Sequence, residues 1–243
     1  MSQHSDAPRN RLLTAVGESD WEQLKDLMEP VELPSGQVLF EAGEPLDRVY
    51  FPETGVISTV APFSNGPPAE MATTGREGVT SVSAALGAEH SFSRHLVQVP
   101  GSALTMEVEA FREAQRELPE FSNLLLAYAR TFLAQVLQSV ACNAMHSVEE
   151  RCARWLLMCR DRGDGDRFLL TQEFLAEMLG VSRASVNLVA RTLQTAGLIR
   201  YSRGGITIVD RHGLEDCACE CYRVVREVYD ATLPLSFVEE QAA

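Results

Sequence analysis

Residues 171–210 read TQEFLAEMLGVSRASVNLVARTLQTAGLIRYSRGGITIVD, and this stretch decides the fold of the C-terminal part of the chain. Apolar residues recur at helical spacing on both sides of Gly180, a residue type that ends helices in the left-handed conformation. Ser182 is placed to cap the second helix, and Gly197 to end it. Two short β-branched runs around residues 202–205 then predict a hairpin. Two helices joined at a glycine and followed by a hairpin predict a winged helix-turn-helix, a motif that places its second helix in the DNA major groove.

The start of the second predicted helix carries polar side chains suited to reading DNA. Arg183 can donate two hydrogen bonds to a guanine edge, and Asn187 can add a base contact. Serine hydroxyls and a glutamine at the helix starts suit phosphate oxygens, and an arginine on the hairpin is placed to reach the adjacent backbone. The predicted DNA-binding residues are Gln172, Ser182, Arg183, Ser185, Asn187 and Arg203.

The charge distribution is compatible with a DNA partner. The whole chain has a net charge of −13, which by itself argues against a polyanion. Residues 171–211, however, hold five arginines and three acidic residues, so this segment alone is positive. The local potential at the contact face matters more for docking than the total charge. With 45% hydrophobic and 23% charged residues, the rest of the composition is that of a soluble globular protein.

Residues 172–186, QEFLAEMLGVSRASV, resemble the DNA-binding domain of the Crp/Fnr family of bacterial transcription regulators. The family pattern is close to Q-E-x-L-A-x-x-L-G-V-S-R-x-S/T-V-x-R. The resemblance carries the guanine contact over to Arg183. Family members often have Glu after this arginine and a second arginine four residues further on, whereas this chain has Ala184 and Leu188. The resemblance implies double-stranded DNA as partner, with RNA polymerase as a further candidate.

The N-terminal half predicts a β sandwich or barrel. Short β-branched runs separated by glycines extend from Val31 to Val108. The segments LPSG (33–36) and LFEAGE (39–44) resemble the effector-sensing jelly roll of the same family. The predicted strands are Val38–Phe40, Val49–Phe51, Val56–Ala61, Ala69–Thr73, Leu96–Val99 and Ala103–Val108.

These predictions combine into an α+β chain with three parts. An N-terminal β jelly roll (a double-stranded β-helix) covers residues 1–118, a long dimerisation helix covers 119–145, and the winged helix-turn-helix covers 146–243. Two Ser-x-x-Glu capping boxes, at 19–22 and 147–150, mark predicted helix starts, and the second places a hinge before the DNA-binding part. A final helix is predicted over Leu214–Val228.

The ligand-binding half of the jelly roll departs from the cyclic-nucleotide-binding members of the family. Those members have a Gly-Glu pair for the ribose and Arg-Ser/Thr-Ala for the cyclic phosphate. Here Arg94 is followed by His-Leu, and no Gly-Glu pair stands at the right distance before it. We therefore expect no cyclic nucleotide, and we expect Arg76, Glu77 and Arg94 to be surface or turn residues. An unidentified effector and a constitutive regulator without ligand both remain open.

Residues 120–145, which follow Pro119, predict one long helix that is apolar on two faces. The face formed by Leu124, Leu133, Leu137 and Val140 is assigned to the jelly roll. A parallel homodimer would bury the other face, and a helix buried within a monomer is the alternative. The predicted dimer interface is Phe121, Leu125, Tyr128, Phe132 and Val136.

No metal site, cofactor or enzyme activity is predicted. In CACEC (217–221) a continuous helix would put only Cys217 and Cys221 on one face, and His146 and His212 are expected as capping or surface residues. Residues 160–166 are expected to form a polar turn without the spacing of a calcium loop. No nucleophile–base pair, phosphate loop or paired carboxylates stand out.

The sequence also predicts where the protein acts. No uninterrupted apolar run approaches the roughly 18 residues that cross a bilayer, and the N-terminus lacks the apolar region of a signal peptide. We expect a cytoplasmic protein without membrane contact. The remaining alternative of another class is a small-ligand or protein-interaction module whose helix-turn-helix does not bind DNA, which Ala184, Leu188 and the acidic total charge would allow.

Overall fold

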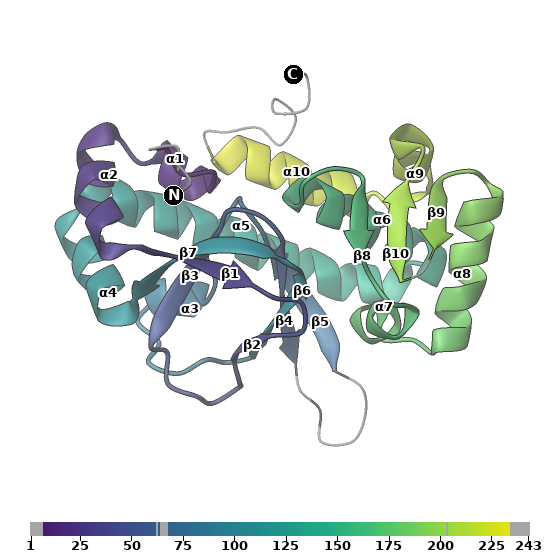
Figure 1. Ribbon diagram of the computed structural model, residues 1–243, viewed down its shortest axis with the longest axis horizontal. Helices are drawn as coiled ribbons and strands as arrows, with labels where there is room; N and C mark the ends of the chain where they lie inside the picture. Colours follow the sequence, from purple (N-terminus) through teal and green to yellow (C-terminus); the bar gives the residue numbers. More distant parts are fainter. Residues whose placement is uncertain (1–6, 62, 64–67, 203, 234–243) are drawn as a thin grey trace.

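The computed structural model describes residues 7–61, 63, 68–202 and 204–233. A β sandwich forms the N-terminal part, and helices with a small sheet form the C-terminal part (Figure 1). One long helix, α5 (Pro119–Met145), runs behind the sandwich toward the C-terminal helices. The predicted α+β class and the predicted long helix are confirmed.

The sandwich consists of two antiparallel sheets with strand orders β1-β7-β3 and β2-β6-β4-β5. Strands β2 to β7 overlap the six predicted runs. The sequence did not predict β1, which contains Pro30 and lies at the edge of its sheet, where a missing N–H group is tolerated. The strands are β1 (Glu29–Leu33), β2 (Val38–Phe40), β3 (Arg48–Pro52), β4 (Val56–Ala61), β5 (Ala69–Thr74), β6 (Arg94–Val99) and β7 (Gly101–Glu107).

Short helices close one end of the sandwich around an aromatic core. The rings of Phe111 and Phe121 meet edge to face at 5.9 Å, and Phe51 lies beside both. The predicted capping box at 19–22 is wrong, because α2 begins at Glu18 after Gly17 and has no side-chain cap. The short helices are α1 (Arg11–Ala15), α2 (Glu18–Leu24), η1 (Lys25–Leu27), α3 (Val82–Ala85) and α4 (Val108–Glu117).

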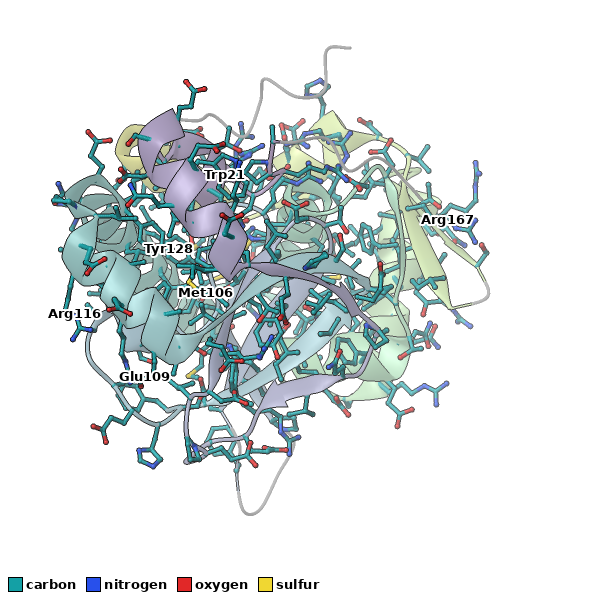
Figure 2. All side chains as sticks on the ribbon, turned by 60° about the vertical axis from the view of Figure 1, so that its left-hand side comes forward. Trp21, Met106, Glu109, Arg116, Tyr128 and Arg167 are labelled. Atoms are coloured by element: carbon teal, nitrogen blue, oxygen red, sulfur yellow. The ribbon has the colours of Figure 1, made fainter. Side chains whose placement is uncertain are left out.

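The two faces of α5 are the reverse of the sequence prediction. In Figure 2 Tyr128 lies inside the molecule, whereas Glu109 and Arg116 project outward from α4. The predicted interface residues Phe121, Leu125 and Tyr128 are buried in the sandwich core of their own chain, with Phe132 packed against it and Val136 partly covered. Of the face assigned to the sandwich, only Leu124 packs against its core, whereas Leu133 is 57%, Leu137 62% and Val140 66% exposed.

The C-terminal part begins at the predicted second capping box, which is confirmed by the hydrogen bonds between Ser147 and Glu150. A third strand, β8, joins the predicted hairpin in the order β8-β10-β9. The predicted last helix is broken between Cys217 and Cys221. The elements are α6 (Val148–Arg162), β8 (Arg167–Leu169), α7 (Gln172–Leu179), α8 (Arg183–Thr195), β9 (Ile199–Ser202), β10 (Gly205–Ile208), α9 (Arg211–Cys217) and α10 (Cys221–Thr232).

The last helix, α10, returns from the C-terminal part to pack along α5. Its Val225 and Tyr229 belong to the same buried cluster as the sandwich core. By length and hydropathy alone, α5 is a helix that could cross a membrane, with a mean hydropathy of 1.3 in its most apolar 18-residue window. Its packing against α3, α4, α10 and β5 gives this apolar surface a role within the fold.

Candidate nucleic-acid interface

Local capping interactions fix both ends of the turn between α7 and α8. The Thr171 hydroxyl accepts a hydrogen bond from the Phe174 N–H at 3.2 Å and caps α7. Gly180 ends α7 with φ of +64°, a conformation in which a Cβ atom would be strained. The Ser182 hydroxyl accepts from the Ser185 N–H at 3.2 Å and caps α8. The predicted helix boundaries at this turn are confirmed.

The inward face of α8 sets the orientation of this helix. Val186, Val189 and Leu193 are buried in the C-terminal core, together with Trp155 of α6 and Leu175 of α7. Each such side chain stabilises the folded state by roughly 1.5–3 kcal/mol when it is fully buried. Rotating α8 about its axis would expose these residues. Their burial therefore determines which face of α8 points away from the core.

The outward face of α8 carries two arginines. Ala184, Leu188, Arg191 and Thr195 are spaced four, three and four residues apart and are all exposed, and Arg183 lies beside them in the first turn. Figure 1 shows α8 at the outer edge of the molecule, away from the sandwich. The sequence analysis did not include Arg191 in the site. Its spacing of three residues from Leu188 would have placed it on the same outward face, opposite the buried stripe.

The hydroxyls of Ser182 and Ser185 lie 2.9 Å apart at the N-terminus of α8. One hydroxyl donates to the other in this pair, so one hydroxyl hydrogen stays available for a ligand. The N–H groups of the first helical turn also point out of the helix there, and with the helix dipole they favour an anion. Of the other predicted residues, Gln172 and Asn187 are half-buried, and Arg203 lies outside the described residues.

The small sheet next to α8 adds two more exposed arginines. Thr207 of β10 stands opposite Arg167 of β8 on one side and Arg200 of β9 on the other. Residues in register on neighbouring strands share one face of a sheet, so these two arginines flank Thr207 on the same face. Figure 2 shows Arg167 projecting outward. The sequence did not predict these residues as part of the site because it did not predict β8.

Tyr201 links the small sheet to the segment before α7 and to α8. Its hydroxyl donates to the Leu170 carbonyl at 2.9 Å, and its backbone N–H donates to the Gln194 side chain at 2.9 Å. Burial raises the pKa of Tyr201 above its ordinary value, and the nearby charge of Arg183 opposes this rise. These hydrogen bonds fix β9 to the residue before the α7 cap and to the last turn of α8.

Arg76 and Glu77 lie in a turn between β5 and α3, as expected, but neither is at the surface. Glu77 is 1% exposed and forms a 2.7 Å ion pair with Arg162 at the end of α6. Arg76 is buried too and pairs with Asp164 at 2.6 Å. Arg94 does lie at the surface, where it pairs with Glu41.

Arg162 is the centre of this contact between the sandwich and the C-terminal part, which we call the joint. Besides Glu77, its guanidinium donates to the Gln135 side chain of α5 at 2.8 Å and to the Met158 carbonyl at 3.2 Å, and it lies over the Tyr229 ring. A Cβ atom on Gly75 would come within 2.5 Å of the Arg162 side chain, so a glycine is required there. The exposed polar turn predicted over residues 160–166 is therefore only partly confirmed, because Arg162 is buried at the end of α6.

Glu70 of β5 forms a second contact in the joint. Trp155 of α6 donates to one carboxylate oxygen at 2.9 Å, and the Ser58 hydroxyl lies 2.6 Å from the other. Ser58 also donates to the Gln98 side chain at 2.5 Å. Burial raises the pKa of Glu70 to about 7. A protonated Glu70 can donate to Ser58, which leaves the Ser58 hydrogen for Gln98.

The chain is similar to known proteins in sequence and in fold. The Crp-like helix-turn-helix domain matches residues 150–217. The chain is 27% identical over 206 residues to the CRP-like cAMP-activated global transcriptional regulator of Mycobacterium tuberculosis, covering 77% of this chain and 87% of that protein. It is 26% identical over 211 residues to the global nitrogen regulator of Synechococcus elongatus, covering 83% and 94%. The structure of FixK2 from Bradyrhizobium japonicum gives a TM-score of 0.66 at 16% identity, covering 79% of this chain and 98% of that one.

An N-terminal jelly roll, a long helix and a winged helix-turn-helix with outward arginines define a DNA-binding regulator of transcription. The comparisons support a regulator similar to the Crp/Fnr family, as the sequence motif around Arg183 predicted, and the Crp-like domain match lies in the C-terminal part of the chain.

Proposed function

We propose that this regulator acts as a homodimer that binds a palindromic DNA site through α8 and the small sheet. The observation that carries the proposal is the clustering of exposed arginines: Arg183 and Arg191 on α8, and Arg167 and Arg200 on the sheet beside it. An outward basic face on an otherwise acidic protein is the electrostatic footprint of a nucleic-acid contact. The same face disfavours the alternative of a helix-turn-helix that has lost DNA binding.

Each residue of the proposed interface has a role. Arg183, at the tip of α8, donates to the O6 and N7 atoms of a guanine, and Asn187 adds a base contact. Ala184 and Leu188 present methyl groups toward the groove, where thymine methyl groups are their natural contact. Phosphate contacts come from Gln172, Ser182, Ser185, Arg167, Arg191, Arg200 and Arg203.

The dimer in this proposal uses the exposed face of α5. Leu126, Leu133 and Val140 are seven residues apart, and Leu137 lies between the last two, so they form the stripe of a coiled-coil seam. A twofold axis along this seam would bring two copies of α8 to successive turns of the major groove. The proposed functional division is sensing over 1–118, dimerisation over 119–145 and DNA binding over 146–243, with α10 packed back on α5.

The sensing part would control the spacing of the two α8 helices. We place an unidentified effector there and expect it not to be a cyclic nucleotide, although the mycobacterial relative is named for activation by cAMP. Glu77, the acidic residue of the loop between β5 and α3, is already paired with Arg162. The regulator would work in the cytoplasm without catalytic activity, with RNA polymerase as its further partner.

Sedimentation and DNA binding by the intact protein test this proposal together. The wild-type chain should sediment as a dimer and bind a site selected from genomic DNA with two protomers per duplex. Replacing Leu133 and Leu137 by Glu should give a monomer that binds the full site at least tenfold more weakly, because the two half-sites are no longer linked. Leu86→Glu, at an equally exposed leucine beside α3, is the matched control and should change neither result. The proposed dimer would be overturned if the wild-type chain sediments as a monomer and the Leu133 and Leu137 variant binds the full site as tightly as wild type does.

A further inference from the structure

Three cysteines and a histidine from distant parts of the sequence meet behind the DNA-binding face. Cys142 lies in the last turn of α5, and His146 ends that helix. Cys219 lies in the break between α9 and α10, and Cys221 begins α10. The three thiols are buried and form a cluster of their own. The sequence did not predict this site because it treated residues 214–228 as a single helix, which would direct Cys219 away from Cys221.

The four potential ligand atoms have the spacing of one tetrahedral site. The Sγ atoms of Cys142 and Cys219 are 3.5 Å apart, and Cys221 Sγ is 3.5 Å from Nδ1 of His146. All four atoms lie within 4.8 Å of one another. Bonds of about 2.3 Å from sulfur to zinc place tetrahedral ligand atoms about 3.8 Å apart, so small shifts would close the site. The Sγ separation of Cys142 and Cys219 is far longer than the roughly 2.05 Å of a disulfide.

Neighbouring side chains orient these ligands as outer-shell groups do in metal sites. Glu220 lies 3.2 Å from Nε2 of His146, which favours a proton on Nε2 and leaves the Nδ1 lone pair directed at the thiols. Gln138 donates to the Cys221 sulfur at 3.0 Å. A hydrogen bond to sulfur stabilises the thiolate form that binds a metal.

We propose that Cys142, His146, Cys219 and Cys221 bind one zinc-class divalent ion. Three thiolates and one imidazole form a closed structural zinc set, and they leave no open position for catalysis. A single ion explains why all four ligand atoms converge on one point, whereas an iron–sulfur cluster spreads its thiolates over several irons. Metal binding would release the thiol protons, and no other bond changes.

The ion would join two segments that determine where α8 points. His146 stands at the connection between α5 and α6, and Cys219 and Cys221 stand at the break between α9 and α10, the two helices that follow the small sheet. Binding one ion to both segments makes part of the binding energy a contribution to the stability of this arrangement. The consequence for DNA binding rests on the proposed function, whereas the metal site itself does not.

Metal content of the full-length protein, purified under reducing conditions, tests the site. Wild-type protein should retain one zinc per chain after dialysis, and Co²⁺ in its place should give the absorption of tetrahedral cobalt with thiolate charge transfer. Cys219→Ser should lower metal affinity by roughly tenfold or more. Cys217→Ser is the matched control, because Cys217 belongs to the same CACEC segment but packs against the C-terminal core, and it should retain full occupancy. Glu220→Gln should weaken binding by about 10–100-fold through His146.

Each of two results would overturn the site: folded wild-type protein, verified by circular dichroism, that binds neither Zn²⁺ nor Co²⁺, or unchanged affinity in Cys219→Ser. Chelation should lower the melting temperature of wild type and of Cys217→Ser alike. Equal melting temperatures with and without chelator would contradict the structural role. DNA binding measured on the same samples separates the two proposals. Wild-type protein that holds one zinc per chain but does not recognise DNA would count only against the proposed DNA-binding function.

Discussion

Arg162 and Arg183 show two opposite uses of the same side chain. Arg162, in the joint, is 3% exposed and donates to a carboxylate, an amide and a backbone carbonyl. Arg183, at the tip of α8, is exposed and projects from a helix whose other face is buried. A buried charge is tolerated only with full pairing, whereas an exposed one needs no partner within the chain.

The comparison separates positioning from recognition. The joint holds the end of α6 against the sandwich, and α6 carries the core on which α8 rests. Substitutions in the joint should therefore act on stability, and substitutions at the tip should act on DNA recognition. The following predictions test this division.

The largest effect is expected for Arg162→Met. Removing the guanidinium leaves the Glu77 carboxylate buried without its partner, which should lower the free energy of unfolding by about 3–5 kcal/mol. Urea unfolding followed by circular dichroism would measure the loss. The double variant Arg162→Met/Glu77→Gln should recover part of it, because no unpaired charge remains. Equal losses in the single and double variants would contradict a buried ion pair.

Arg183→Ala should give the opposite result. Because the side chain is exposed, we expect the free energy of unfolding to change by no more than about 0.5 kcal/mol. Discrimination at one base position should fall by about 1–3 kcal/mol. Fluorescence anisotropy with duplexes carrying each base at that position would measure it. A variant that loses stability but keeps its discrimination would reverse the roles assigned to the two arginines.

Glu70 should make the stability of the joint depend on pH, whereas Arg183 at the tip of α8 should add no such dependence. Its pKa is about 7 in the folded protein against an ordinary value of 4.5, so the folded state holds this proton more tightly than the unfolded chain. This contribution to stability is fully present below about pH 4.5 and is lost as pH rises through about 7. After allowance for solvent screening of a partly exposed group, the loss should be about 1–2 kcal/mol. Unfolding of Glu70→Gln over the same pH range should lack this slope, and an unchanged slope would exclude Glu70 as its source.

The smallest effect is expected for Arg191→Ala. An outward arginine that contacts phosphate should weaken all DNA sequences alike and lower the salt dependence of binding by about 0.9 in log–log slope. Binding isotherms at several salt concentrations would show this. Arg112→Ala, on α4 in the sandwich part, is a control that should leave the slope unchanged. A sequence-specific loss in Arg191→Ala would instead make this residue a base reader.

The parts of the molecule predicted well from sequence are those with local causes. Gly180, Ser182 and Ser147 act within a few residues of their own helix ends, so their roles follow from neighbouring residues. The β1 strand was missed because its pairing with β7 involves residues about 70 positions away and its Pro30 argues against a strand.

The missed features depend on contacts between distant segments. A helix apolar on two sides gives no local sign of which side faces its own chain, so the faces of α5 were reversed. Arg162 looked like a turn residue because Glu77 and Gln135 are far away in sequence. The grouping of His146 with Cys219 likewise needed the break between α9 and α10.

A double-mutant cycle between protein and DNA tests the central claim most directly. It combines Arg183→Ala with replacement of the contacted guanine by 7-deazaguanine, which removes the N7 acceptor. If the tip of α8 reads this base, the two changes should be strongly non-additive, with a coupling energy of about 1–3 kcal/mol. Additive losses would show that Arg183 does not contact the base and would contradict the account.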